Sequence, residues 1–268
     1  ESLGRTFPIE TRYLGRPDRL EDGVARAVSK ALAEETGSIL VFLPGQGEIR
    51  RVEALLAERL RDPAVIVAPL YGAMNFKAQD LAISPAPAGR RKVVLATAIA
   101  QTSLTIEGVR VVIDGGLARV PRFDPGSGLT RLKTERVSRA SADQRQGRAG
   151  RTEPGIAYRP WDEPETRGLV AFDRPEILEA DLTGLVLDLA RWGATSPEGL
   201  LFLDPPPRGA WDQALAQLTA MGALDGAGHL TPHGRAVSEL PLPAALAYML
   251  VKAAERGEAG QAARIAVL

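Results

Sequence analysis

Ser38-Ile39-Leu40-Val41-Phe42-Leu43-Pro44-Gly45 has the pattern of one buried strand and the turn that ends it. Five apolar side chains follow Ser38 without a polar interruption, whereas a strand with one face in water alternates apolar and polar residues. An uninterrupted run of this length is typical of a strand covered on both faces, as in a parallel sheet. Pro44-Gly45 then marks the turn.

The same order of strand, turn and helix recurs on both sides of this stretch. It predicts further strands at residues 7–14, 64–70, 92–97 and 109–114, and helices at residues 23–35, 48–60 and 76–83. Strands that alternate with helices are typical of an α/β fold, in which a parallel sheet carries helices on its faces. Gly45-Gln46-Gly47 is interpreted as a structural turn, because Arg50 stands where the third glycine of a dinucleotide fingerprint would fall.

Composition and charge limit the classes of protein to consider. The 268 residues are 45% apolar and include no cysteine, which indicates a globular protein and excludes a disulfide scaffold or a thiolate metal site. No apolar run has the length of a membrane span and no signal peptide opens the chain, so we expect a cytoplasmic protein without a membrane partner. The net charge is zero, yet residues 117–151 hold nine basic and three acidic side chains, whereas residues 160–225 hold four and twelve. This asymmetry predicts a polyanion partner for residues 117–151.

The octet Gln144-Arg145-Gln146-Gly147-Arg148-Ala149-Gly150-Arg151 combines arginines with two glycines. If residues 142–151 form a helix, Arg148 and Arg151 share a face, because they are three positions apart. Each glycine would weaken that helix by roughly 1 kcal/mol relative to alanine, and close approach of the backbone to a ligand is a reason to accept it. A solvated basic face is the alternative, but such a face gains nothing from glycine.

The octet has the form Q-R-x-G-R-x-G-R and resembles motif VI of the DEAH-box group of superfamily 2 helicases. Residues 113–119 resemble the bacterial HrpB type within that group. The resemblance implies an ATP-dependent RNA helicase with a RecA-like sheet, in which Gln144, Arg148 and Arg151 face the triphosphate of ATP and both arginines act as fingers. A guanidinium suits this role, because it is always charged and binds two phosphate oxygens at once.

Residues 97–106 resemble motif V of the same family. The resemblance implies that Thr97 contacts RNA, and that Ser103, Thr105 and Glu107 contact the nucleotide. An ordinary turn rich in serine and threonine is the alternative for this segment taken alone. Hydroxyl groups suit a loop that bonds phosphates on both sides.

Three positions depart from the family pattern. Ala98 replaces an asparagine and Gln101 a glutamate, which bears on one hydrogen bond to nucleic acid and one charge contact between domains. Ile83 is aligned with the aromatic residue that stacks on adenine in the family, so weaker stacking on the base is expected.

Residues 117–136 contain two strand-like runs around Asp124-Pro125-Gly126-Ser127-Gly128, which predicts a β-hairpin. In the family such a hairpin projects from the second RecA-like domain and helps to separate strands. The resemblance implies that its basic side chains meet phosphates, and these are Arg119, Arg122, Arg131 and Lys133. A solvated hairpin is the alternative.

The composition changes between residues 160 and 175, where prolines and acidic residues gather. One face of a helix is predicted to be core and is formed by Leu178, Leu182, Leu185, Val186, Leu189 and Trp192. Phe202–Pro207 resembles a segment of DEAH-box proteins. A helix is predicted over residues 211–221 and ends at Gly222. Thr231-Pro232 is predicted to cap the start of a further helix. Short helices around a small turn fit the winged helix that the resemblance implies. No metal site is predicted, because Pro232 separates His229 from His233 and no acidic residue joins them.

We therefore expect a second RecA-like domain at residues 1–160, a winged helix at 161–240, and the start of a truncated helical domain at 241–268. The chain has no Gly-Lys dipeptide and hence no P-loop, and its Asp162-Glu163 pair precedes Pro164 in a predicted loop. ATP and Mg²⁺ would be held mainly by an N-terminal RecA-like domain of the same protein, with RNA or single-stranded DNA as the nucleic-acid partner. The chain alone is then expected to be inactive. A stand-alone RecA-like binding or adaptor protein is the alternative, although paired arginines have no purpose without an ATP site opposite them.

Overall fold

The computed structural model describes residues 7–102, 106–124, 126 and 128–267. The chain separates into two compact units. The first consists of residues 1–120 and 132–173, and the second of residues 121–131 and 174–268. The domain boundaries at residues 160 and 240 stay a prediction. None of the helices in the described part of the chain combines the length and the apolar character needed to cross a membrane.

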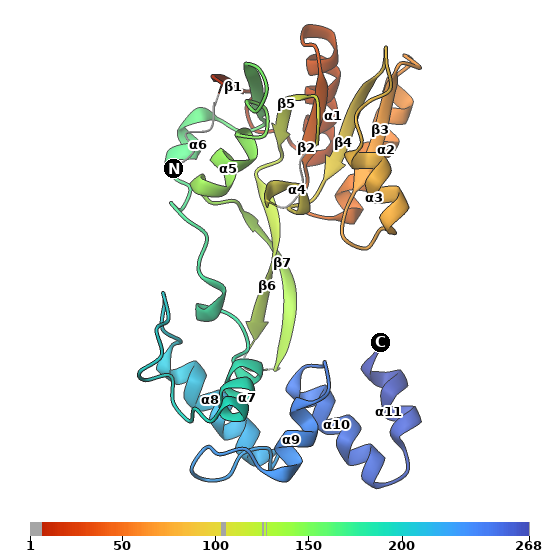
Figure 1. The fold of residues 1–268 in the computed structure, drawn as a ribbon. Helices are drawn as coiled ribbons and strands as arrows, with labels where there is room; N and C mark the ends of the chain where they lie inside the picture. Colours follow the sequence, from red (N-terminus) through yellow and green to blue (C-terminus); the bar gives the residue numbers. More distant parts are fainter. Residues whose placement is uncertain (1–6, 103–105, 125, 127, 268) are drawn as a thin grey trace. The chain divides into compact units, whose positions relative to one another are not determined.

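The first unit is built on a parallel sheet of six strands in the order β1-β8-β5-β2-β4-β3 (Figure 1). The strands are β1 (Ile9–Tyr13), β2 (Ser38–Phe42), β3 (Val65–Leu70), β4 (Arg91–Ala96), β5 (Val109–Asp114) and β8 (Gly155–Arg159). Every residue of β2 is buried, which explains its uninterrupted apolar run. The predicted α/β class with a parallel sheet is confirmed; the sequence pattern did not indicate β8.

Alternate side chains of β2 enter two separate apolar cores. Ile39 and Val41 pack with helices α1 (Leu20–Glu34) and α2 (Gln46–Arg59), whereas Leu40 and Phe42 face the opposite side. That opposite face carries α3 (Phe76–Ile83) and the short α4 (Ile99–Thr102). It also carries α5 (Arg139–Gln146), which contacts β5. Helices therefore cover both faces of the sheet.

A two-stranded hairpin follows β5, as predicted. It consists of β6 (Leu117–Asp124) and β7 (Leu129–Arg136). In the turn, the Asp124 carbonyl accepts a hydrogen bond of 2.8 Å from the Gly128 N–H, and Gly128 has a φ of 66°. Glycine adopts this left-handed conformation without strain, so it suits the position. Pro125 and Ser127 lie outside the described residues.

Apart from residues 121–131 of the hairpin, the second unit is built from helices in its described residues. Its elements are η1 (Glu176–Leu178), α7 (Thr183–Trp192), α8 (Arg208–Ala220), α9 (Pro232–Ser238), α10 (Ala244–Glu255) and α11 (Ala259–Ala266). Residues 224 and 230 form an antiparallel bridge between α8 and α9. The Thr231 hydroxyl caps α9 by accepting a hydrogen bond of 2.9 Å from the Gly234 N–H, as the sequence predicts.

Two predictions about helices were wrong. The helix predicted from Leu178 begins only at Thr183, because the Asp181 carboxylate accepts hydrogen bonds from the Thr183 N–H (3.0 Å) and hydroxyl (2.7 Å). Leu178 and Trp192 are 42% and 79% exposed, so neither is a core residue. Asp162-Glu163 does not lie in a loop either, since Glu163 begins helix α6 (Glu163–Arg167), directly after its N-cap residue.

Candidate functional site

Two segments that carry the predicted site run side by side over the α3 face of the sheet. The first, residues 97–108, leaves the carboxyl end of β4 and reaches the amino end of β5. The second, residues 139–154, passes through α5 and reaches the amino end of β8. Ala100 and Ile106 of the first segment and Ala149 of the second are buried in one apolar core. Their packing holds the described residues of both segments against the sheet.

Gln101 joins the two segments. Its side-chain nitrogen donates hydrogen bonds to the Ser141 hydroxyl (2.8 Å) and to the Gln144 side-chain oxygen (2.9 Å). Its side-chain oxygen accepts one from the Arg145 Nε (3.1 Å), and its carbonyl accepts one from the Arg148 Nε (3.0 Å). Gln101, one of the residues that depart from the family pattern, thus holds residues 144–148 in place within the first unit.

Arg145 is a buried anchor that sequence reasoning missed. It is 1% exposed, and its guanidinium lies 2.8 Å from the Asp114 carboxylate, which is also buried. The guanidinium lies over the ring of Phe42 at 5.0 Å. The sequence signal is Asp114 itself, because a carboxylate that ends a buried strand requires a partner. Arg145 is therefore occupied inside the domain and is not available to a ligand.

The helix considered over residues 142–151 is formed only as far as residue 146. Helix α5 ends at Gln146, and Gly147 follows as its cap, so Arg148 and Arg151 lie in turns beyond it. Beyond the helix, a Cβ at Gly150 would lie 2.8 Å from the Phe7 carbonyl oxygen. The close approach that explains this glycine is to the neighbouring backbone and not to a ligand.

Arg148 and Arg151 differ in exposure. Arg148 is 7% exposed, and its burial, followed by the charge of Arg151, lowers the pKa of its guanidinium. An arginine nevertheless stays protonated in a protein. Arg151 and Gln144 are exposed. The second segment thus presents one exposed and one buried guanidinium, with Gln144 held by Gln101.

Substitution of the two glycines separates their roles. Gly150→Ala is expected to destabilise the fold by about 1–3 kcal/mol, because the added methyl group overpacks against the residue 7 backbone. Gly147→Ala is the matched control, since its nearest neighbour would be 3.4 Å away and its φ of −57° suits alanine. Its stability should be unchanged or raised by up to about 1 kcal/mol. Urea unfolding of both variants measures the difference, and equal midpoints would contradict this account of Gly150.

The predicted nucleotide and RNA residues of the first segment lie at opposite edges of the sheet. Thr97 follows β4 at the carboxyl edge, where its N–H donates a 3.2 Å hydrogen bond to the Leu70 carbonyl. Glu107 is exposed in the turn that precedes β5 at the amino edge. Ser103 and Thr105 lie outside the described residues. Ile83, at the end of α3, is half-buried and packs against the apolar core of that face.

The basic side chains of the hairpin are not equivalent. In the first unit, the Arg119 guanidinium lies 3.4 Å from the Glu48 carboxylate. In the second unit, Arg122 forms an ion pair with Glu179. Arg131 is exposed. Lys133 is also exposed, and its amine lies 3.9 Å from the Glu135 carboxylate. Arg131 and Lys133 are therefore the better placed of the four to meet a phosphate.

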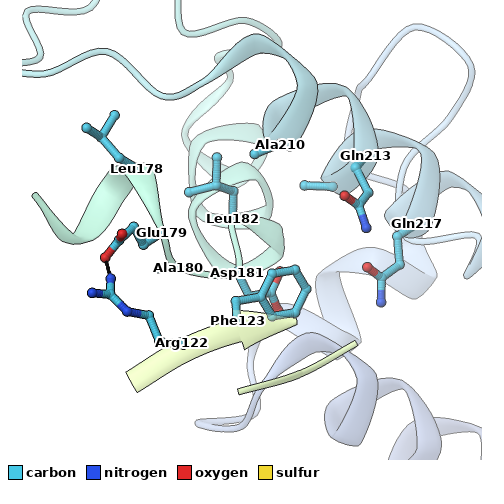
Figure 2. Close-up of a pocket in the computed structure, with 11 residues that line it drawn as sticks. Arg122, Phe123, Leu178, Glu179, Ala180, Asp181, Leu182, Ala210, Gln213 and Gln217 are labelled. Atoms are coloured by element: carbon cyan, nitrogen blue, oxygen red, sulfur yellow. Dashed lines mark ion pairs between the residues drawn. The ribbon is translucent and has the colours of Figure 1, made fainter. Parts of the chain in front are cut away.

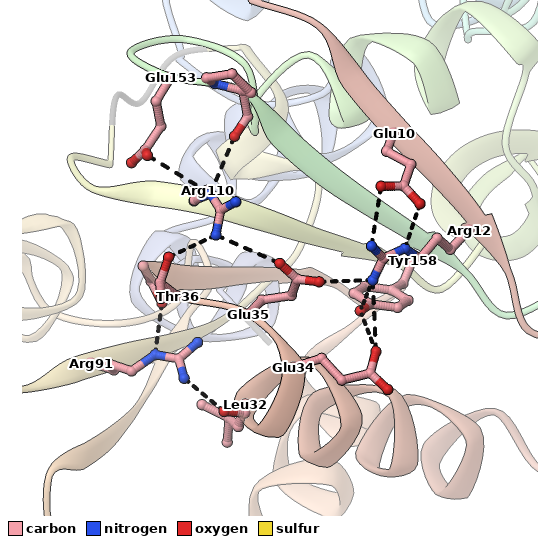
Figure 3. Close-up of polar contacts among 12 residues, drawn as sticks. Glu10, Arg12, Leu32, Glu34, Glu35, Thr36, Arg91, Arg110, Glu153 and Tyr158 are labelled. Carbon is pink, nitrogen blue, oxygen red and sulfur yellow. Dashed lines mark hydrogen bonds and ion pairs between the residues drawn. The ribbon is translucent and has the colours of Figure 1, made fainter.

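A polar network holds the β1 edge of the sheet against α1 (Figure 3). The Arg12 guanidinium donates hydrogen bonds to Glu10 and Glu35, both at 2.7 Å, and to the Tyr158 hydroxyl at 2.9 Å. The bond from Arg12 lowers the pKa of Glu10, while burial raises the pKa of Tyr158. The network ties together β1 and β8, the strand into which the second segment leads.

Comparisons with known proteins identify helicases that are similar to this chain. Residues 23–153 match the model of the helicase conserved C-terminal domain, and residues 214–242 match that of the winged-helix helicase associated domain, HA2. The chain is 48% identical over 269 residues to the ATP-dependent RNA helicase HrpB of Escherichia coli, in an alignment that covers 100% of this chain and 33% of HrpB. It is 39% identical over 262 residues to the pre-mRNA-splicing factor ATP-dependent RNA helicase prp22 of Schizosaccharomyces pombe, over 95% of this chain and 22% of that helicase.

The solved structures show the same similarity. The crystal structure of the Escherichia coli DEAH/RHA helicase HrpB matches with a TM-score of 0.91 at 49% identity, over 98% of this chain and 34% of that one. The chain thus spans about a third of the length of HrpB. These similarities confirm the RecA-like fold, the winged helix and the resemblance to DEAH-box helicases.

Proposed function

Because this chain carries the helicase conserved C-terminal domain and the HA2 winged helix, we propose that it is the C-terminal part of the core of a DEAH-box ATP-dependent RNA helicase. The observation that carries the proposal is the joining of the two segments by Gln101, which holds Gln144 and Arg148. Such preorganised groups stabilise a transferring phosphoryl group without reorganisation during the reaction. The protein would use ATP hydrolysis to move along RNA or to unwind it, and it would act in the cytoplasm.

The residues of the site divide into two roles under this proposal. Gln144, Arg148 and Arg151 contact the triphosphate of ATP, and the two guanidinium groups offset the charge that develops in the transition state. The other nucleotide contacts are assigned to Ile83, Ser103, Thr105 and Glu107. Thr97 at the carboxyl edge contacts the RNA backbone, as do the exposed Arg131 and Lys133 of the hairpin. Arg119 and Arg122 contribute less, because their side chains are 38% and 29% exposed, against 71% for Lys133.

The remaining part of the ATP site is assigned to an N-terminal RecA-like domain of the same protein. A P-loop supplies backbone N–H groups and a lysine to the phosphates, and this sequence contains no Gly-Lys pair. Among the residues that the structure describes, no three His, Asp or Glu side chains gather as a metal site. The Mg²⁺ that accompanies ATP is therefore assigned to that domain too, and none of the steps above involves it.

Binding of single-stranded RNA tests the nucleic-acid part of the proposal. With about three phosphates neutralised, log K should fall with log salt at a slope near −2, from roughly −0.7 per contact on a single strand. The affinity should be weaker than ~10⁻⁵ M at physiological salt, which is the range of non-specific binding. Fluorescence anisotropy with labelled RNA at several salt concentrations measures both quantities.

Charge-removing variants identify the contacts. Arg131→Gln or Lys133→Gln should each reduce the magnitude of the slope by about 0.7, because one phosphate contact is lost. Lys252→Gln is the control, since Lys252 lies on α10, where its amine pairs with Glu255 at 3.0 Å. Tight binding that does not respond to salt or to the hairpin variants would contradict the proposed backbone contacts.

A further inference from the structure

The second unit contains a pocket that the proposed ATP and RNA-backbone contacts do not use (Figure 2). We name it the α8 pocket, and its volume is about 240 Å³. Arg122 and Phe123 of the hairpin tip, residues 178–182, and one face of α8 line it. Every lining residue belongs to the second unit.

The shape of the α8 pocket follows from the spacing of residues on that helix. Ala210, Gln213, Ala214 and Gln217 lie three or four positions apart and therefore share one face. The alanines leave the space open, and Figure 2 shows the amides of Gln213 and Gln217 extending from α8 on the side of the pocket that holds the Phe123 ring. Neither amide has a hydrogen-bond partner among the described residues. Both are free to bond a ligand.

The charged groups of the α8 pocket are already paired. Arg122 forms an ion pair with Glu179, and the Asp181 carboxylate accepts hydrogen bonds from the N–H and hydroxyl of Thr183. A phosphate or another ion would have to break one of these pairs. The groups that remain are an aromatic ring, apolar side chains and two neutral amides. This set suits a flat, uncharged group with hydrogen-bonding edges.

We propose that the α8 pocket binds one nucleobase of single-stranded RNA, which stacks on the Phe123 ring and forms hydrogen bonds with Gln213 and Gln217. Stacking of bases on aromatic side chains and hydrogen bonding to exposed base edges are the usual means by which proteins bind single-stranded RNA. A glutamine amide offers both a donor and an acceptor to such an edge. The inference rests on the proposed function, because it requires RNA to reach the hairpin tip.

The test uses single-stranded RNAs that carry one 2-aminopurine at successive positions, because the fluorescence of this base falls when it stacks. The chain is titrated with each RNA, and binding is followed separately by the anisotropy of an end label. One position should show quenching on binding. Replacing the base at that position with an abasic site should weaken binding roughly fivefold to one-hundredfold, the effect expected from one stacked base.

Variants distinguish stacking from mere packing. Phe123→Leu keeps an apolar side chain but has no aromatic face, so it should abolish the quenching. Ala210→Leu should do so by filling the pocket, and Gln213→Ala should weaken binding without affecting the ring. Phe172→Ala is the matched control for loss of an exposed phenyl ring, since Phe172 is 77% exposed in the first unit. Thr219→Ala is the control for α8, because Thr219 is exposed outside the pocket lining.

The outcomes separate this inference from the proposed function. Quenching at one position that disappears in Phe123→Leu and Ala210→Leu, but persists in both controls, supports the inference. RNA binding without a position of quenching, or with quenching that survives both substitutions, overturns the inference and leaves the proposed function intact. An absence of RNA binding by the unsubstituted chain would contradict the proposed function and the inference together.

Discussion

Replacement of Arg148 or Arg151 by alanine is expected to lower kcat for ATP hydrolysis by ~10³-fold or more, the effect of losing an arginine finger. The experiment requires a protein in which this chain is joined to a RecA-like domain that has a P-loop and a DEAH box. Arg148 is 7% exposed and bonds to the Gln101 carbonyl, so its guanidinium is held ready before the nucleotide binds. Preorganisation of this kind is what makes such a group effective in the transition state.

Two controls make this result specific to ATP chemistry. Arg139→Ala removes an exposed arginine from the start of α5, the helix that precedes both residues, and kcat should change little. The affinity for RNA should also change little in Arg148→Ala and Arg151→Ala, because the proposed RNA contacts are Thr97, Arg131 and Lys133 and not these two arginines. Steady-state hydrolysis at saturating RNA and anisotropy with labelled RNA measure the two quantities. Equal losses in turnover and in RNA binding would mean that these arginines hold RNA instead.

Removal of one partner of the buried Arg145–Asp114 pair is expected to destabilise the fold by about 3–5 kcal/mol, because it leaves an uncompensated charge in the interior. The two side chains are 1% and 3% exposed and 2.8 Å apart. Asp114 also accepts a hydrogen bond of 2.9 Å from the Gly116 N–H, so Asp114→Ala removes a second partner. The hairpin begins at this point, and its first strand should lose order when the pair is broken.

A matched ion pair and a double variant test the cause of this effect. The Arg208–Asp212 pair on α8 is exposed, with side chains 96% and 62% accessible, and Asp212→Ala should change stability by less than about 1 kcal/mol. Arg145→Met combined with Asp114→Leu removes both charges and should recover much of the loss. Urea unfolding of the three variants compares them. A loss below about 1 kcal/mol for Asp114→Ala would show that the pair is not a structural anchor.

The sequence pattern predicts the sheet well, because a strand that is buried on both faces has an uninterrupted run of apolar residues. The run from Ile39 to Leu43, ended by Pro44-Gly45, is typical of a strand covered on both faces, and the helices between the strands follow from their apolar periodicity. The resemblance of residues 144–151 to motif VI likewise identified the helicase class. Strand β8 was missed, because its residues 155–159 include Tyr158 and Arg159, whose polar atoms are buried through hydrogen bonds.

The details of the candidate site depend on tertiary contacts that no local pattern contains. The need for glycine at position 150 comes from the Phe7 backbone, which lies far away in the sequence. The different availabilities of Arg122 and Arg131 likewise depend on Glu179, which pairs with Arg122 and with Arg174. Charge counts treat these two arginines as equal, whereas in the structure Arg122 is paired with Glu179 and Arg131 is exposed.

ATP hydrolysis by the chain alone, compared with that of the chain joined to a RecA-like domain carrying a P-loop and a DEAH box, tests the central claim most directly. The claim is that this chain supplies arginine fingers and nucleic-acid contacts to an ATP site whose phosphate-binding part lies elsewhere. It predicts no measurable turnover by the chain alone, and RNA-stimulated turnover that depends on Arg148 in the joined protein. Robust, Arg148-dependent turnover by the chain alone would contradict it.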